Sequence, residues 1–273
     1  MAINTYKNHC YIIMKRHFLL ILFTCSSLAI CAQTKKGKVK DSKPAQNSNA
    51  EFEIRRYNQA IKYGDISVAI NSIYTLITKY PDQASYKDSL ARIYFQVGSF
   101  NQCLRVCEDL SISRPNDTTI LRMMAMSHQS LGFIAEAIAE FEQVVKQTGN
   151  VYDIYQKATL EYRIKRLQES KISIETVIAK ATVKDMITLY IDKENKQEVP
   201  LQAAAFNLYG MIAKEFNDTA SARFLFNKAI ELFPEFYFAN ANIKFMNESG
   251  KTSQEPDPAT EPGKEDLDER RKK

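Results

Sequence analysis

The sequence of 273 residues is poor in the residues that build turns, metal sites and disulfide frameworks. It contains eight glycines, eight prolines, five cysteines, three histidines and no tryptophan. The scarcity of glycine and proline favours a helical protein over a turn-rich β protein. Because apolar residues make up 45% of the chain, with 15 Phe and 14 Tyr, most of it can bury a core.

Few of the side chains that usually perform catalysis are present. His9 and His17 lie near the N-terminus, so His128 is the single histidine beyond residue 32. One histidine without Asp, Glu or His at ligand spacing cannot build a familiar zinc site, and Ser127 and Ser130 have the pattern of ordinary helix residues. No dinucleotide-binding G-x-G-x-x-G occurs. We therefore expect His128 to fill a packing slot in a protein that is not an enzyme and has no cofactor or metal.

Cysteine provides no disulfide framework either. Three of the five cysteines lie within the first 32 residues, and Cys103 and Cys107 are the two beyond them. Their spacing differs from the C-x-x-C of redox and metal sites, and a disulfide between them within one helix would be strained. We expect two buried thiols.

The first 32 residues have the layout of a secretory signal peptide. Lys15 and Arg16 precede the apolar run at 18–23, and small residues then lead to Ala32. The apolar stretch is too short and too interrupted for a membrane span. We expect cleavage after Ala32 and a periplasmic or secreted protein, with Met14 as an alternative true start.

A lipoprotein anchored at Cys31 is the alternative, although Ile30 stands where the lipoprotein peptidase normally requires Gly, Ala or Ser. The sequence around the predicted cleavage site, Cys31-Ala32-Gln33, resembles that of exported proteins of the Bacteroidetes.

The charge of the remaining chain is nearly balanced. Residues 1–32 carry three basic and no acidic residues, so 34 basic residues face 32 acidic ones in the rest. Such a balance argues against a nucleic-acid partner. Residues 33–49 have the composition of a flexible basic linker, and residues 248–273 that of a disordered charged tail.

Four sets of residues repeat at an interval of 34, which indicates a repeated structural unit. The sets are Gly64, Gly98 and Gly132; Pro81 and Pro115; Ala69, Cys103 and Ala137; and Tyr57, Ala91 and Ala125. The pattern resembles the tetratricopeptide repeat, in which small residues, aromatics, a glycine and a proline recur at fixed positions. The copy that matches it best contains Gly210, Ala222, Phe226 and Pro234.

The resemblance implies an all-α fold, a right-handed α-solenoid of about five helix pairs with a C-terminal capping helix. The pairs are expected near residues 50–83, 84–117, 118–151, 152–182 and 203–236, within a repeat domain at 50–247. Small residues would let paired helices approach closely. The fourth pair fits the pattern only if its turn at Lys165 and Arg166 is one residue shorter.

An insertion at residues 183–200 interrupts the repeats. Ile187 and Leu189 alternate with Thr188 and Tyr190, the period of a β-strand, and a polar turn follows. We predict a short β-hairpin, with an irregular loop as the alternative.

The resemblance also implies that the first helices of the pairs line a concave groove that binds a protein or peptide. The predicted groove residues are Asn58, Arg92, Phe95, Gln96, Arg122, Met126, Gln129, Asn207, Met211 and Lys214. For each of them an ordinary solvated surface is the alternative. Because Ile54 and Asp88 occupy positions where the family's two-carboxylate clamp needs other residues, that activity is not expected.

These patterns lead to an exported, non-catalytic scaffold for a protein or peptide partner. The alternative is an accessory subunit of an envelope machine, for secretion or outer-membrane assembly, that docks through the hairpin or the convex face. The identity of the partner and the oligomeric state are left open.

Overall fold

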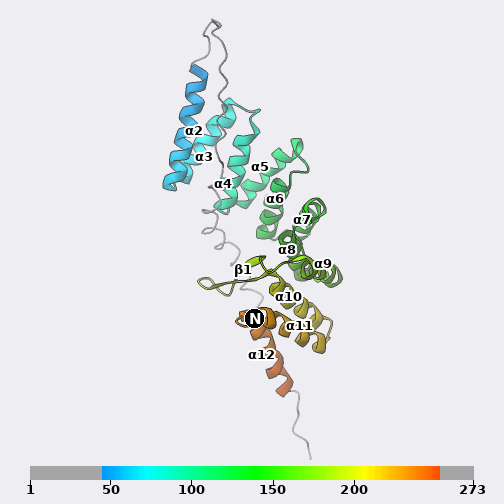
Figure 1. The fold of residues 1–273 in the computed structure, drawn as a ribbon. Coiled ribbons are helices and arrows are strands. Elements are labelled where there is room, and N and C mark those ends of the chain that lie inside the picture. The colour runs from blue at the N-terminus through cyan, green and yellow to red at the C-terminus, as the bar shows by residue number, and fades with distance from the viewer. Residues whose placement is uncertain (1–44, 253–273) are drawn as a thin grey trace, which may run out of the picture.

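The computed structural model describes residues 45–252, which form an elongated stack of eleven helices and one β-hairpin (Figure 1). The predicted signal peptide, most of the linker and most of the tail lie outside the described residues. The helices are α2 (Ala45–Tyr63), α3 (Ile66–Lys79), α4 (Ala84–Gln96), α5 (Phe100–Ser113), α6 (Thr118–Leu131), α7 (Ile134–Thr148), α8 (Val151–Arg163), α9 (Leu167–Lys180), α10 (Leu201–Glu215), α11 (Thr219–Leu232) and α12 (Tyr237–Thr252). The strands are β1 (Met186–Tyr190) and β2 (Lys196–Pro200).

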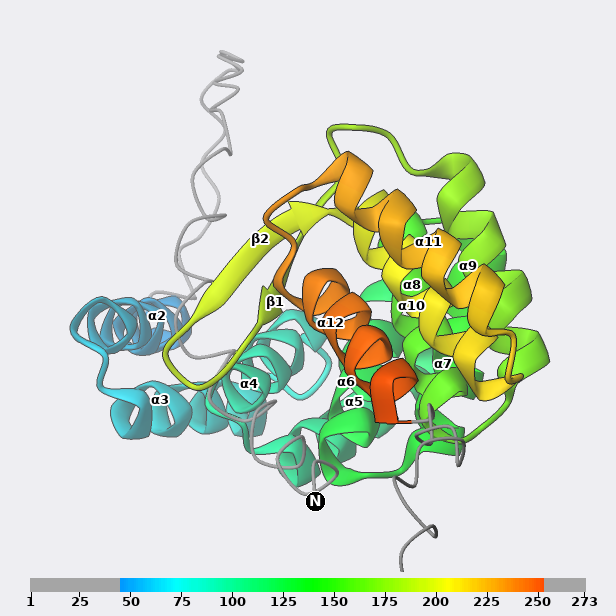
Figure 2. The same ribbon diagram turned by 90° about the horizontal axis from the view of Figure 1, so that it is seen from below.

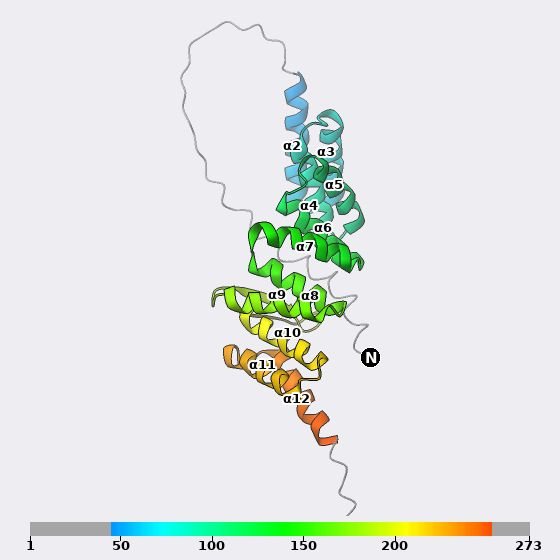
Figure 3. The same ribbon diagram turned by 90° about the vertical axis from the view of Figure 1, so that its right-hand side faces the viewer.

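The helices pack in chain order, so the predicted solenoid of five pairs and a capping helix is confirmed. Contacts are most extensive within the pairs α2–α3, α4–α5, α6–α7, α8–α9 and α10–α11, and each pair also contacts the next. Figure 3 shows the stack in profile, with α2 at one end and α12 at the other. The buried residues form a series of clusters along the stack rather than one central core, as expected when each repeat contacts its neighbours.

Small residues lie where the two helices of each pair meet. In the second helices this position has no exposed surface, and it holds Ala69, Cys103, Ala137, Ser170 and Ala222. In the first helices Ala91, Ala125 and Ala158 are equally buried. Gly210 takes the same place in α10, where an added Cβ would lie 2.6 Å from the ring of Phe226. The recurring small residues therefore mark helix–helix contacts, as the interval of 34 predicts.

The turn within each pair contains one residue with a positive φ angle. In the first three pairs this residue is a glycine, for example Gly132 with φ 91°. Lys165 (φ 62°) and Asn217 (φ 61°) take its place in the fourth and fifth pairs. Glycine adopts this conformation freely, whereas a side chain such as that of Lys165 costs about 1–2 kcal/mol there.

The fourth pair has the same turn length as the others, which corrects our expectation of a shorter turn. Ala158 and Ser170 are twelve residues apart, the same separation as in the other pairs, and Ser170 Oγ donates to the Ala158 carbonyl at 2.8 Å. The one-residue shortening lies in the loop before α8 instead, because only Gly149 and Asn150 join α7 to α8. Gly149 ends α7 with a φ of 60°, and Asn150 caps the first turn of α8.

Both ends of the repeat domain extend further than the sequence predicted. Helix α2 begins at Ala45, inside the expected linker, and Pro44 directly precedes it in the sequence, where proline suits a helix start. Helix α12 runs to Thr252, inside the expected tail. As predicted, α12 caps the stack, and Ala239 within it and Phe236 directly before it are fully buried against the preceding helices.

The predicted β-hairpin is confirmed at residues 186–200. Its two strands pair antiparallel, with Thr188 opposite Glu198 at the centre. Val199 is fully buried, and Ile187 and Leu189 pack against the cluster formed by α8, α9 and α10. Seen along the stack, the hairpin lies on the opposite side of α8 and α10 from α9 and α11 (Figure 2). It therefore lies on the side of the first helices.

Candidate partner-binding surface

The predicted groove residues lie on the first helices of the pairs, and four of them reach the surface on the successive first helices α4 and α6. Arg92 is exposed on α4, and Gln96 is half-buried one turn later. Met126 and Gln129 are half-buried on α6, the next first helix. A guanidinium, two amides and a thioether therefore reach the surface of two successive helices. Such groups can bond a peptide backbone and contact apolar side chains.

Two predicted groove residues are buried, and the expectation that they face solvent is wrong. Phe95 is 8% exposed and packs edge-on against Phe100, with ring centroids 6.1 Å apart. It lies in the last turn of α4, where the first turn of α5 covers it. Asn207 is also 8% exposed, and its Oδ1 accepts a hydrogen bond from Asn242 Nδ2 at 2.9 Å. Asn207 thus joins α10 to the capping helix.

Arg122 is engaged in a bidentate ion pair with Asp153. Its Nε lies 3.0 Å from each carboxylate oxygen, and its second terminal nitrogen lies 2.8 Å from Oδ2. The Arg122 side chain is 33% exposed and that of Asp153 only 9%. The hydrogen bonds to Asp153 raise the pKa of Arg122. This pair connects α6 to α8, so the Arg122 charge is already neutralised within the protein.

The remaining predicted groove residues lie near the two ends of the stack. Asn58 is exposed on α2. Met211 packs in the cluster that joins α10, α11 and α12. Lys214 is exposed, and its Nζ lies 4.1 Å from the centre of the Phe245 ring. These three residues do not extend the accessible patch on α4 and α6.

His128 occupies the packing slot that the sequence predicted, and it has a charged partner. Its Nδ1 lies 2.9 Å from a carboxylate oxygen of Glu140 on α7. Burial raises the pKa of Glu140, and the hydrogen bond with His128 partly offsets this effect. The ring of Phe133 packs edge-on against His128. The histidine therefore joins α6 to α7.

Cys103 and Cys107 are buried free thiols, as predicted. Their sulfur atoms are 3.9 Å apart on successive turns of α5. The hydrogen bond with Cys103 and burial together raise the pKa of Cys107. A neutral, inaccessible thiol reacts slowly with oxidants and electrophiles.

Within residues 45–252, no group of three His, Cys, Asp or Glu side chains is arranged to hold a metal ion. In the same part of the chain, every helix falls short of the length and apolar character that a membrane span needs.

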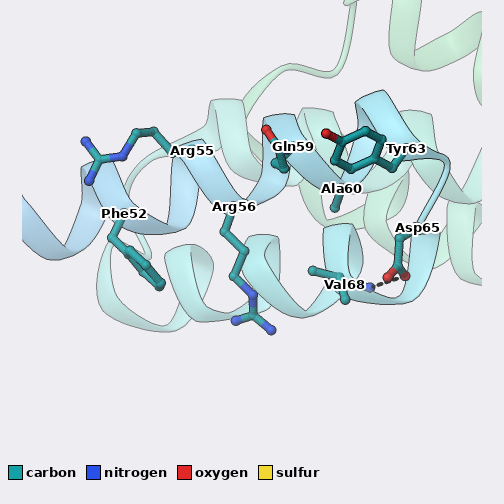
Figure 4. Close-up of a pocket in the computed structure, with 8 residues that line it drawn as sticks. All are labelled: Phe52, Arg55, Arg56, Gln59, Ala60, Tyr63, Asp65 and Val68. Carbon is teal, nitrogen blue, oxygen red and sulfur yellow. Dashed lines mark hydrogen bonds between the residues drawn. The ribbon is translucent and has the colours of Figure 1, made fainter.

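An open surface pocket of about 490 Å³ lies at the N-terminal end of the stack, lined by α2 and the start of α3 (Figure 4). One face of α2 lines it with Phe52, Arg55, Arg56, Gln59, Ala60 and Tyr63. Phe52 is 54% exposed and Tyr63 is 71% exposed. In each later pair, the second helix of the preceding pair packs against the first helix. The described helices begin with α2, so none of them covers α2 in this way. Sequence reasoning missed this surface because the repeat pattern does not show where the stack begins.

The geometry defines an α-solenoid with a short polar surface on its first helices. Residues 203–236 match the family model of the tetratricopeptide repeat. One repeat of this chain therefore matches the family model, and the stack of helix pairs has the fold of tetratricopeptide-repeat proteins. None of the curated proteins matches it in sequence.

Solved structures of tetratricopeptide-repeat proteins have the same fold. A tetratricopeptide repeat protein from Parabacteroides merdae has a TM-score of 0.60 and 15% identity, over 75% of this chain and 76% of that one. YrrB, described as a TPR protein with an unusual peptide-binding site, has a TM-score of 0.58 and 13% identity, over 74% and 98% of the two chains. MamA from Desulfovibrio magneticus RS-1 has a TM-score of 0.51 and 22% identity, over 62% and 86%.

Proposed function

We propose that this protein is an exported scaffold that binds a protein or peptide partner along its first helices without catalysing a reaction. The observation that carries the proposal is the patch of Arg92, Gln96, Met126 and Gln129 on α4 and α6. The nearby Arg122 is engaged in an ion pair with Asp153 within the protein, whereas the polar groups of this patch have no such ion pair among the described residues. Partner binding is the common function of tetratricopeptide-repeat proteins, and these are generally non-catalytic.

Export rests on the predicted signal peptide, with cleavage after Ala32 and a periplasmic or secreted product. N-terminal sequencing of the protein purified from its native host tests this part. A first residue of Gln33 supports it, a lipid-modified Cys31 favours the anchored alternative, and an intact Met1 or Met14 contradicts export.

A peptide-selection experiment tests the binding surface. Short linear peptides are selected from a random displayed library against the purified protein, and their affinities are measured by fluorescence polarisation. We expect the double substitution Arg92→Ala with Met126→Ala to weaken binding by about tenfold or more, since it removes a charged donor and an apolar contact. The control is Arg105→Ala, which removes an exposed arginine from the second helix α5. Equal affinity of all three proteins would exclude the patch.

An accessory subunit of an envelope machine is the second candidate, favoured by exposed apolar side chains on the second helices of the pairs, which we call the outer helices because they lie on the side away from the hairpin (Figure 2). Ile172 on α9 is 65% exposed and Phe224 on α11 is 60% exposed. In this case Ile172→Asp with Phe224→Asp would abolish co-purification with a defined envelope complex, while the Arg92 and Met126 substitutions would not. The reverse pattern would refute docking through the outer helices.

A further inference from the structure

We propose that β1 is an open strand edge to which an extended peptide segment of the partner adds as a third strand. This inference rests on the proposed partner binding and specifies how the partner's backbone is held. Strand addition is a general mode of peptide recognition in which main-chain hydrogen bonds supply affinity. The hairpin is the single sheet among residues 45–252.

The ladder leaves backbone groups of β1 directed away from β2. At the base of the hairpin, Leu201 N–H donates to the Asp185 carbonyl at 2.8 Å, and at the tip Ile191 N–H donates to the Asn195 carbonyl at 3.0 Å. Residues 185 and 191, which flank β1, therefore belong to hydrogen-bonded pairs, as does every second residue between them. Bonded and non-bonded pairs alternate along an antiparallel ladder. Thr188 and Tyr190 fall in the non-bonded set, so their N–H and C=O groups point to the open side. Among the described residues, none donates to or accepts from these groups.

The two edges of the hairpin differ in how they are protected. Natural edge strands carry charged residues or proline, which discourage pairing with another strand. β2 has these features, because it contains Lys196, Glu198 and Pro200. β1 has the sequence Met-Ile-Thr-Leu-Tyr, without charge or proline and with residues that favour strands. The structure therefore leaves β1 as the edge open to a further strand.

The hairpin is held in place before any partner binds. The Gln197 amide donates to the Glu235 carbonyl at 2.6 Å and accepts from Tyr237 N–H at 3.0 Å. At its base the Asp185 carboxylate accepts from Thr182 N–H at 2.7 Å. An isolated two-stranded hairpin is marginally stable, but this one is fixed to the stack. A fixed edge lowers the conformational entropy lost on binding.

The position of β1 identifies the occupant as a single extended segment. The Tyr152 hydroxyl on α8 bonds to Asp185 and to the backbone of Met186, so β1 starts beside a first helix. β2 is tied instead to the loop before α12 through Gln197. The outward N–H and C=O groups of Thr188 and Tyr190 have the spacing of one extended backbone, which a single segment of the partner matches. An uncharged segment with alternating β-branched or aromatic residues fits this edge best.

Proline substitutions on opposite edges test the inference with the selected peptide as the probe. Thr188→Pro removes the outward N–H of β1 without removing a bond to β2, and Glu198→Pro does the same on the other edge. We expect Thr188→Pro to weaken peptide binding by about tenfold or more, and Glu198→Pro and Thr188→Ala to leave it within a factor of about two. Circular dichroism and the melting temperature of each variant show whether the fold is retained.

Amide hydrogen exchange provides a readout that does not depend on a variant. In ¹⁵N-labelled protein, saturating peptide should slow the exchange of the Thr188 and Tyr190 amides by about tenfold or more and leave that of Glu198 unchanged. Unaltered exchange at Thr188, together with equal affinity of Thr188→Pro, would overturn the inference. If Arg92→Ala with Met126→Ala still abolished binding, the proposed function would stand without it.

Two other outcomes also contradict the inference. A concentration-dependent dimer of the peptide-free protein that Thr188→Pro dissociates would identify a second copy as the occupant of the edge. Failure to select any binding peptide would remove both the proposed function and the strand addition that rests on it.

Discussion

Replacing Gly210 with alanine tests whether small residues set the distance between paired helices. An added Cβ would lie 2.6 Å from Cε1 and 2.7 Å from Cδ1 of the Phe226 ring. Because Phe226 is 1% exposed, its ring has little free space into which to move. Overpacking of this kind costs about 1–3 kcal/mol, and Ala in a helix interior is about 1 kcal/mol better than Gly. Since the buried ring cannot move away, the cost should lie in the upper part of that range, about 2–3 kcal/mol, and we expect a net loss of about 1–2 kcal/mol in the free energy of unfolding.

The loss can be measured by urea unfolding followed by circular dichroism and by the melting temperature. For a repeat domain of this length, a loss of 1 kcal/mol lowers the melting temperature by about 2–4 °C. Since a solenoid can open in parts, native-state hydrogen exchange of the α10 amides should accompany the global measurement. An unchanged or raised stability of the Gly210→Ala protein would refute the argument.

A double-mutant cycle with Phe226→Leu identifies the cause. Without the ring, the clash disappears and the helix propensity of alanine remains, so Gly210→Ala should then be neutral or stabilising by up to about 1 kcal/mol. The third pair shows that the fold itself tolerates alanine at this position, because Ala125 and Phe141 lie together in one buried cluster. If α10 and α11 could separate without cost, the two substitutions would show no coupling.

Two further substitutions test polar contacts. Arg122→Ala leaves the Asp153 carboxylate buried without its bidentate partner, so it should lower the free energy of unfolding in urea by about 2–3 kcal/mol. Adding Asp153→Asn should restore part of this loss. A loss below about 0.5 kcal/mol would contradict this account. Hydrogen bonds from the Thr182 N–H and hydroxyl lower the pKa of Asp185, so Thr182→Val should raise that pKa toward 3.8 in an NMR titration of the carboxyl group, and an unchanged pKa would show that the hydroxyl is unimportant. Because the folded pKa is the lower one, the stability that this carboxylate contributes is present above pH 3.8 and is lost as the pH falls through the folded pKa.

The repeat architecture was predictable from the sequence because its signal is steric and local. Only a small side chain fits where the two helices of a pair cross, as at Ala69 and Ala137. Small residues that recur at an interval of 34 therefore identify the crossings. The turn of the fourth pair was misread because the shortened loop before α8 shifted the count. Gly149 and Asn150 carry the correct signal, since a helix end and a cap in adjacent residues leave no room for a longer loop.

The exposure of individual groove residues was less predictable, since it depends on neighbours from other elements. Phe95 has the spacing of a solvent-facing residue, but the first turn of α5 covers it. Asn207 is buried because α12 supplies Asn242 as its partner. The pairing of Arg122 with Asp153 could have been predicted, because opposite charges about one repeat apart lie on neighbouring first helices.

The hairpin adds a surface to the stack without dividing it. Although residues 181–200 separate α9 from α10, these two helices pack together as neighbouring pairs do elsewhere, and α10 also contacts α8. A loop of this length adds little to the closure entropy of a stack whose helices already meet. Burial of Val199 and the bonds of Gln197 then fix the strands beside the first helices. An insertion that served only as a connection would need neither of these contacts, and their presence is the physical reason to test β1 as part of the binding surface.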